Sequence, residues 1–137
     1  MYQTIAVPVD LEHIEHLTKA LRTAVDLAEH YGATLHYVGA TTETPNPIAH
    51  NPAEYQEKLE AFAKERADEH GVATAAKMIV SLDMTIDLDK QLRDAFEEIG
   101  ADLVVMASHI PGVTDHLFSS NAGWIANYSP MSVFIVR

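Results

Sequence analysis

The sequence predicts an α/β fold: a single doubly wound sheet of five parallel strands, with helices on both faces. Short apolar segments rich in β-branched residues alternate along the chain with segments of helical periodicity. Such alternation requires crossover connections, which pair the strands in parallel and are right-handed. No internal repeat or linker divides the 137 residues, so we expect one domain spanning residues 1–137.

The first half of the chain is expected to form two strands and two helices. The run TIAVPVD at 4–10 reads as a buried strand that ends in an acid, and ATLHYVGA at 33–40 as a second strand. Apolar residues at helical spacing extend over 17–32 and 52–70, and a glycine stops each helix. The prolines within 41–51 exclude regular structure there.

The second half is expected to form three strands and two helices. Strands are predicted at 74–83, 101–109 and 132–137, and the second of these is the most apolar of the sheet. Helices are predicted at 86–100, with one apolar face, and at roughly 120–128. This order completes the alternation that the fold class requires.

Composition excludes several kinds of function. Twenty acidic residues against nine Lys and Arg give a formal net charge of -11, which argues against a nucleic-acid surface because a phosphate backbone requires a basic footprint. An acidic cytoplasm would give the same composition. No apolar run approaches the roughly 20 residues that cross a bilayer, so we expect a cytoplasmic protein without membrane insertion. The absence of cysteine excludes disulfides and thiolate metal sites.

Asp10 marks the expected ligand crevice. In sheets of this class, ligands bind beyond the carboxyl ends of the strands, where the winding changes direction. If the strand 4–10 is central, that point lies between it and the strand 101–109, which brings Asp10 opposite the segment 106–120. Two roles are open to its carboxylate: contact with a ribose or a cation, or capping of the following loop or helix.

The segment that follows the fourth strand ends at an expected helix start. Ser119, Ser120 and Asn121 are good N-cap residues, and they leave backbone N–H groups free for an anion at the positive end of the helix. Because every helix has such an end, a plain connection remains the alternative to a phosphate site.

Positive charge is scarce in this part of the chain. His109 and His116 lie in the segment, but no Lys or Arg lies between Arg93 and Arg137. A phosphate would therefore meet N–H groups, hydroxyls, imidazoles or a divalent ion. This argues against fast phosphoryl transfer, which depends on strong charge stabilisation.

The sequence shows no recognisable catalytic constellation. The motifs GxSxG, GxGxxG, GxxxxGK[ST] and HExxH are all absent. In EHIEH, one helical turn could bring His13 and His16 together on a metal, but no third ligand has an identifiable spacing. We therefore interpret this cluster as a solvated polar loop that enters a helix.

The last strand is expected to lie at an edge of the sheet. Its apolar run VFIV would be an aggregation hazard if it stayed bare, and pairing with the same strand of a second subunit would cover it. We therefore expect a homodimer through Ser132–Val136.

The whole chain resembles the universal stress protein family. The similarity runs from TIAVPVD through GATLHYVGA to ADLVVMASH and the closing SSNAGWIANYSPMSVFIVR. The ending is most similar to the filament-type subgroup, in which SH with a following proline, an SN helix start and an SVxxVR terminus recur. The resemblance implies an adenine nucleotide alpha hydrolase-like sheet with the strand order 3-2-1-4-5, and dimerisation through the last strand. In many members it also implies ATP or another adenine nucleotide at the switch point, with or without Mg²⁺.

The phosphate loop departs from the ATP-binding pattern of this family. That pattern is Gly, two residues, Gly, nine residues, Gly, and then Ser or Thr. Here Ala107, Ile110 and Ser119 stand at the glycine positions, the spacer is one residue shorter, and Ser120 follows. The β-branched Ile110 resists positive φ and crowds the backbone, whereas Ser119 keeps its N–H and adds a hydroxyl. The shorter spacer is itself similar to the filament-type subgroup.

The resemblance also implies a role for each matching residue. Asp10 would face the ribose, and Ala40 would contact the adenine through its backbone. The third strand ends in SLDMT, without the Gly-x-Pro that is common in the family. The other implied contacts belong to the crevice wall (Pro8, Val9), the base (Met106, Ala107), the ribose and phosphates (His109, Ile110) and the phosphates alone (Ser119, Ser120, Asn121).

The sequence therefore favours a dimeric stress protein that binds ATP, ADP or AMP as a regulatory ligand. The alternative is a stress protein without nucleotide that acts as an interaction or scaffold dimer. An enzyme comes last and would be at most a slow ATPase, because no catalytic base or strong cation is evident.

Overall fold

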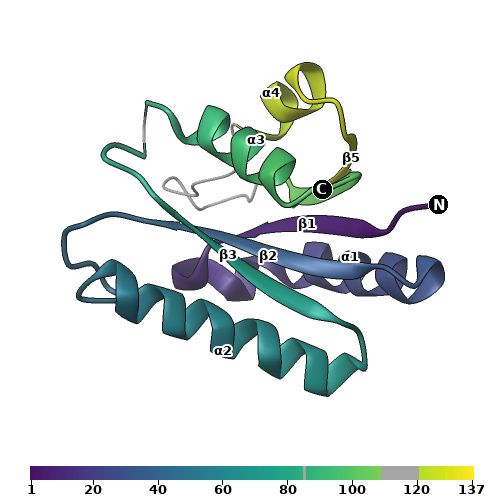
Figure 1. Cartoon of the computed structure of the whole chain (residues 1–137), viewed down its shortest axis with the longest axis horizontal. Helices are drawn as coiled ribbons and strands as arrows, with labels where there is room; N and C mark the ends of the chain where they lie inside the picture. The colour runs from purple at the N-terminus through teal and green to yellow at the C-terminus, as the bar shows by residue number, and fades with distance from the viewer. Residues whose placement is uncertain (85, 109–120) are drawn as a thin grey trace.

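The computed structural model describes residues 1–84, 86–108 and 121–137, and it confirms the predicted fold class. One parallel sheet has the order β3-β2-β1-β4-β5. Figure 1 shows α1 and α2 on one side of this sheet and α3 and α4 on the other. The strands are β1 (Thr4–Val9), β2 (Thr34–Thr41), β3 (Thr74–Val80), β4 (Leu103–Ala107) and β5 (Ser132–Val136).

Helices fill the connections between the strands. A short 3-10 helix, η1, precedes α1, where the sequence pattern indicates a loop. The left-handed Gly32 (φ 65°) and Gly71 (φ 68°) end α1 and α2, as their sequence positions predict. The helices are η1 (Leu11–Leu17), α1 (Thr18–Tyr31), α2 (Pro52–His70), α3 (Leu88–Glu98) and α4 (Asn121–Tyr128).

Two strands, β3 and β4, are shorter than the sequence predicts by more than one residue. β3 stops at Val80 because its partner β2 ends at Thr41, the residue paired with Val80. β4 begins at Leu103, and the preceding Asp102 bonds to both neighbours: its N–H donates to the carbonyl of Thr4 at 3.0 Å, and its carbonyl accepts from the N–H of Ser132 at 3.2 Å. The Asp102 carboxylate accepts hydrogen bonds from the backbone N–H groups of Gln3 and Thr4 at 2.9 and 3.1 Å. Asp102 thereby ties the start of β1 to the strand that becomes its neighbour.

Alternate residues of the central strands pack into two hydrophobic cores, one on each face of the sheet. In β1, Ile5, Val7 and Val9 pack with α1 and α2, while Ala6 packs on the other face with α3 and α4. This is the period of two expected for a strand that is buried on both faces. Burial on both faces fixes the register of β1, so the place where it ends is equally fixed.

No helix in the described part of the chain is long and apolar enough to cross a membrane.

A close contact between β2 and α2 shapes the carboxyl end of the sheet. Gly39 lies against the buried ring of Tyr55, and a Cβ added at Gly39 would come 2.4 Å from the Tyr55 Oη and 3.0 Å from the ring. Only glycine lets α2 approach β2 this closely.

We predict that Gly39→Ala lowers the free energy of unfolding by about 1–3 kcal/mol, because the added methyl group overpacks a site where a rigid ring cannot yield. Urea denaturation followed by circular dichroism measures the change. Gly123→Ala is the matched control: a Cβ there meets no atom of the described residues within 4 Å, and alanine is the better helix former, so it should leave stability equal or higher. Equal stability of the two variants would refute the assigned contact.

Candidate functional site

The topological switch point lies between β1 and β4. β1 pairs with β2 on one side and with β4 on the other, so the connections wind in opposite directions from it. The register joins Ile5 to Leu103 and Ala6 to Val104, and both strands continue beyond these pairs to Val9 and Ala107. The crevice expected for this fold class therefore opens directly beyond the carboxyl end of β1.

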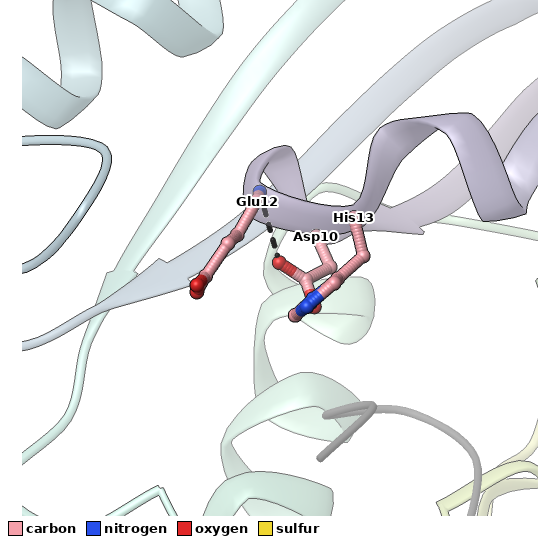
Figure 2. A group of neighbouring side chains, drawn as sticks. All are labelled: Asp10, Glu12 and His13. Atoms are coloured by element: carbon pink, nitrogen blue, oxygen red, sulfur yellow. Dashed lines mark hydrogen bonds and ion pairs between the residues drawn. The ribbon is translucent and has the colours of Figure 1, made fainter. Parts of the chain in front are cut away.

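Asp10 occupies the first position after β1 and is 5% exposed. Its Oδ1 accepts a hydrogen bond from the backbone N–H of Glu12 at 3.1 Å, which makes Asp10 the N-cap of η1. Its Oδ2 lies 2.8 Å from Nδ1 of His13. Figure 2 shows these three side chains together at the start of η1. The capping role left open by the sequence is therefore confirmed, and the carboxylate has an imidazole partner as well.

A kink in η1 brings His13 against Asp10. His13 has non-helical angles (φ -124°, ψ 36°), and its backbone N–H donates to the carbonyl of Asp10 at 3.1 Å. The hydrogen bond to the Asp10 carboxylate raises the pKa of His13 above its usual value, while partial desolvation opposes the shift. The local backbone thus provides a buried carboxylate with a nearby donor.

A small cavity of ≈ 60 Å³ adjoins Asp10. It is enclosed by the ends of β1 and β2, the segment after β2, the first turn of α2 and the segment after β3. Ligand pockets commonly measure about 300–1,000 Å³. An adenine ring would therefore need lining side chains to move. These lining residues are Asp10, Leu11, Glu12, Ala40, Thr41, Asn46, Ile48, Tyr55 and Met84.

Asn46 holds the segment after β2 beside this cavity. Its Nδ2 donates to the hydroxyl of Thr41 at 3.0 Å, and its Oδ1 accepts from the N–H groups of Ile48 and Ala49, both at 3.0 Å. One amide thereby fixes three points of a segment without helix or strand. Tyr55 closes the inner side of the cavity. Its pKa is raised mainly by burial and to a smaller extent by the negative charge of Asp10.

The structure brings only part of the predicted site together. Asp10 and Ala40 both line the cavity, whereas Pro8 and Val9 are buried within β1. Met106 packs into the core with α3 and α4, and Ala107 into the core with α1 and α2, as successive strand residues must. The proposed contacts of these four strand residues with a nucleotide stay predictions.

Other predicted residues lie outside the described part of the chain. They are His109, Ile110, Ser119 and Ser120, and the same holds for the side chain of Asn121, the first residue of α4. Their assignments to ribose and phosphate stay predictions.

Sequence reasoning missed several residues that line the cavity. Tyr55 has the spacing of a core residue of α2, and Asn46 lies in a proline-containing loop, so neither pattern indicates a site. His13 carries a detectable signal, because an imidazole three residues after an N-cap acid can fold back on it. The sequence pattern pairs His13 only with His16, whose ring lies 6.2 Å away between centroids.

A larger hollow lies between η1, α1 and α2. It measures ≈ 520 Å³, and its lining includes Glu15, Glu65, Glu69, Arg22 and Arg66. None of its described lining residues belongs to a strand, and three glutamates there balance two arginines and one histidine. The smaller cavity beside Asp10 is the better candidate because it lies where sheets of this topology bind ligands.

Comparisons with known proteins agree with the fold. The model of the universal stress protein family matches residues 1–137. The Universal stress protein G of Escherichia coli O157:H7 is 30% identical over 143 residues, covering 100% of both chains. This relative agrees with the predicted filament-type resemblance. A universal stress protein family structure from Burkholderia pseudomallei is 25% identical, with a TM-score of 0.71 over 98% of this chain and 96% of that one.

Two solved relatives contain nucleotides. A universal stress protein in complex with cAMP is 19% identical, with a TM-score of 0.69 over 99% of this chain and 97% of its own. The Archaeoglobus fulgidus protein in complex with dAMP is 17% identical, with a TM-score of 0.66 over 99% of this chain and 98% of its own. At these identities the likeness establishes a shared fold. Because the family model spans residues 1–137 and a relative of 30% identity covers the entire sequence, the chain belongs to the universal stress protein family.

Proposed function

We propose that this protein binds an adenine nucleotide, ATP, ADP or AMP, as a regulatory ligand in the cavity beside Asp10. The observation that carries the proposal is a nearly buried carboxylate directly after the central strand, at the switch point of the sheet. Each carboxylate oxygen has one partner in the chain, the N–H of Glu12 or Nδ1 of His13, and keeps capacity to accept a further hydrogen bond from a ribose hydroxyl. The relatives solved with cAMP and dAMP support the same ligand class.

Charge around the cavity favours ligands with few phosphates. The described lining contains two carboxylates, Asp10 and Glu12, and no Lys or Arg. The sequence adds no Lys or Arg between Arg93 and Arg137. Each additional phosphate charge would therefore meet repulsion from the site and from the net charge of -11. A monophosphate such as AMP suits this field better than ATP does.

The same charge deficit argues for binding rather than turnover. Phosphoryl transfer requires strong, preorganised positive charge on the transferred group. The described cavity residues supply hydrogen-bond acceptors and one imidazole partner of Asp10 instead. We therefore propose a nucleotide-responsive protein, with hydrolysis slow or absent.

A scaffold dimer is the second candidate function, and β5 is the observation that favours it. β5 pairs only with β4 in the described sheet, so its other edge is open. Phe134 is 45% exposed on this edge strand. We propose that a second subunit covers β5, with or without nucleotide in the crevice.

The proposed contact between Asp10 and the ribose is tested with the Asp10→Asn variant. Its affinity for AMP and that of the original protein are measured by calorimetric titration. Asparagine still accepts the N–H of Glu12, so η1 is retained, but it loses the charge that strengthens bonds from ribose hydroxyls. We expect affinity to fall by about 10-fold to 100-fold.

An affinity for AMP that does not fall in Asp10→Asn would overturn this assignment. If Asp10 only caps η1, removing its charge should leave the affinity for AMP unchanged or raise it. Asp26→Asn is the control for net charge, because Asp26 is exposed on α1 and pairs with Arg22, at 3.5 Å. It should leave AMP affinity as in the original protein.

The dimer is tested by light scattering on the protein in solution. We expect twice the mass of one chain, and we expect Phe134→Lys to shift the equilibrium toward monomer because it places a charge within the apolar contact. Leu82→Lys is the control, since Leu82 is 99% exposed in the segment after β3, far from β5 in the sheet order. A stable monomer of the original protein would contradict the proposal.

A further inference from the structure

Asp10, Glu12 and His13 form a group of potential metal ligands at the start of η1. One donor atom from each side chain lies within 4.8 Å of the other two. The three residues come from four consecutive positions, and Figure 2 shows Asp10 and His13 side by side, with the Glu12 side chain next to them. The sequence pattern does not indicate this group, because it pairs His13 with His16.

The group is largely prearranged. Asp10 is held by the N–H of Glu12, and Oδ2 of Asp10 and Nδ1 of His13 are already 2.8 Å apart. Ligands of one tetrahedral ion with bonds of about 2.0–2.1 Å lie roughly 3.3–3.5 Å from each other. Two of the three donors are therefore close to a bonding arrangement. The third belongs to Glu12, whose exposed side chain can rotate toward them at little cost.

The donor set selects a class of ion. Mg²⁺ and Ca²⁺ prefer oxygen ligands, whereas imidazole suits Zn²⁺, Ni²⁺ and similar first-row ions. Two carboxylates and one imidazole also leave a coordination position for water or another ligand. We propose that Asp10, Glu12 and His13 bind one divalent transition-metal ion of the Zn²⁺ type, in preference to Mg²⁺.

Such an ion would change the charge of the crevice. Two carboxylates and a neutral imidazole carry a charge of -2, which a divalent ion cancels. The ion would replace the proton on Nδ1 of His13, and its open position adjoins a cavity whose described lining has no Lys or Arg. This second step rests on the proposed nucleotide function: the ion would then offer the phosphate the positive charge that the chain lacks.

The metal site is tested first without nucleotide. Full-length protein is freed of metal with a chelator and titrated with ZnCl₂, and separately with MgCl₂, in a calorimeter. We expect one Zn²⁺ per chain and no detectable Mg²⁺. Loss of even an outer partner of a metal ligand commonly costs about 10- to 100-fold in affinity, so His13→Ala and Glu12→Gln should each weaken Zn²⁺ by at least about 10-fold.

His16→Ala is the matched control. His16 belongs to the same 3-10 helix, and its Nε2 lies 3.6 Å from a Glu15 oxygen, but it is not part of the group. It should bind Zn²⁺ as the original protein does. Glu12→Gln guards against loss of folding, because it removes an exposed carboxylate and keeps the backbone N–H that Asp10 accepts. Circular dichroism verifies the fold of every variant.

Three results would overturn the site: no Zn²⁺ binding, equal affinity of the His13→Ala and original proteins, or equal weakening by His16→Ala. AMP titrated with chelator and with Zn²⁺ separates this proposal from the nucleotide function. AMP binding in chelator without any Zn²⁺ binding would refute only the metal site. Zn²⁺ binding without AMP binding would refute only the nucleotide function. Binding of both, with AMP affinity unchanged by Zn²⁺, would refute the coupling between them.

Discussion

The hydrogen bonds of the Asp10 carboxylate are the constraint on which the candidate site depends. Asp10 follows a strand that is buried on both faces, so its position is set by the core rather than by a surface loop. There it caps η1 through the N–H of Glu12 and engages His13 through the other oxygen. The carboxylate thus joins the sheet, the turn into α1 and the crevice. A change in the protonation or in the partners of Asp10 would therefore affect the sheet, the turn into α1 and the crevice.

Much of the fold follows from the sequence, because alternating strand and helix periods permit few topologies. The five strands and the glycine stops of α1 and α2 were predictable from local pattern, and parallel pairing from the rules of crossover connections. The strand order came from the family resemblance instead. The ends of β3 and β4 were less predictable, because they depend on how far the neighbouring strands pair with them.

The site was only partly predictable for the same reason. The topology rule places Asp10 at the crevice without any side-chain detail, and the family resemblance adds Ala40. Tyr55 reaches the crevice because α2 approaches β2 closely at Gly39, and Asn46 because its side chain bonds to Thr41. Neither contact follows from the periodicity of the sequence. The contact between Asp10 and His13 requires a backbone kink inside a short helix. A site of this kind combines one residue fixed by topology with several fixed by local geometry.

The central claim is that an adenine nucleotide binds at the carboxyl ends of the central strands, beside Asp10. The most direct measurement is a two-dimensional ¹⁵N–¹H spectrum of the labelled protein titrated with AMP. We expect saturable shifts of the amides of Asp10, Glu12, Ala40 and Thr41, which surround the cavity. Shifts confined to the hollow between α1 and α2, or no shifts at millimolar AMP, would contradict the claim.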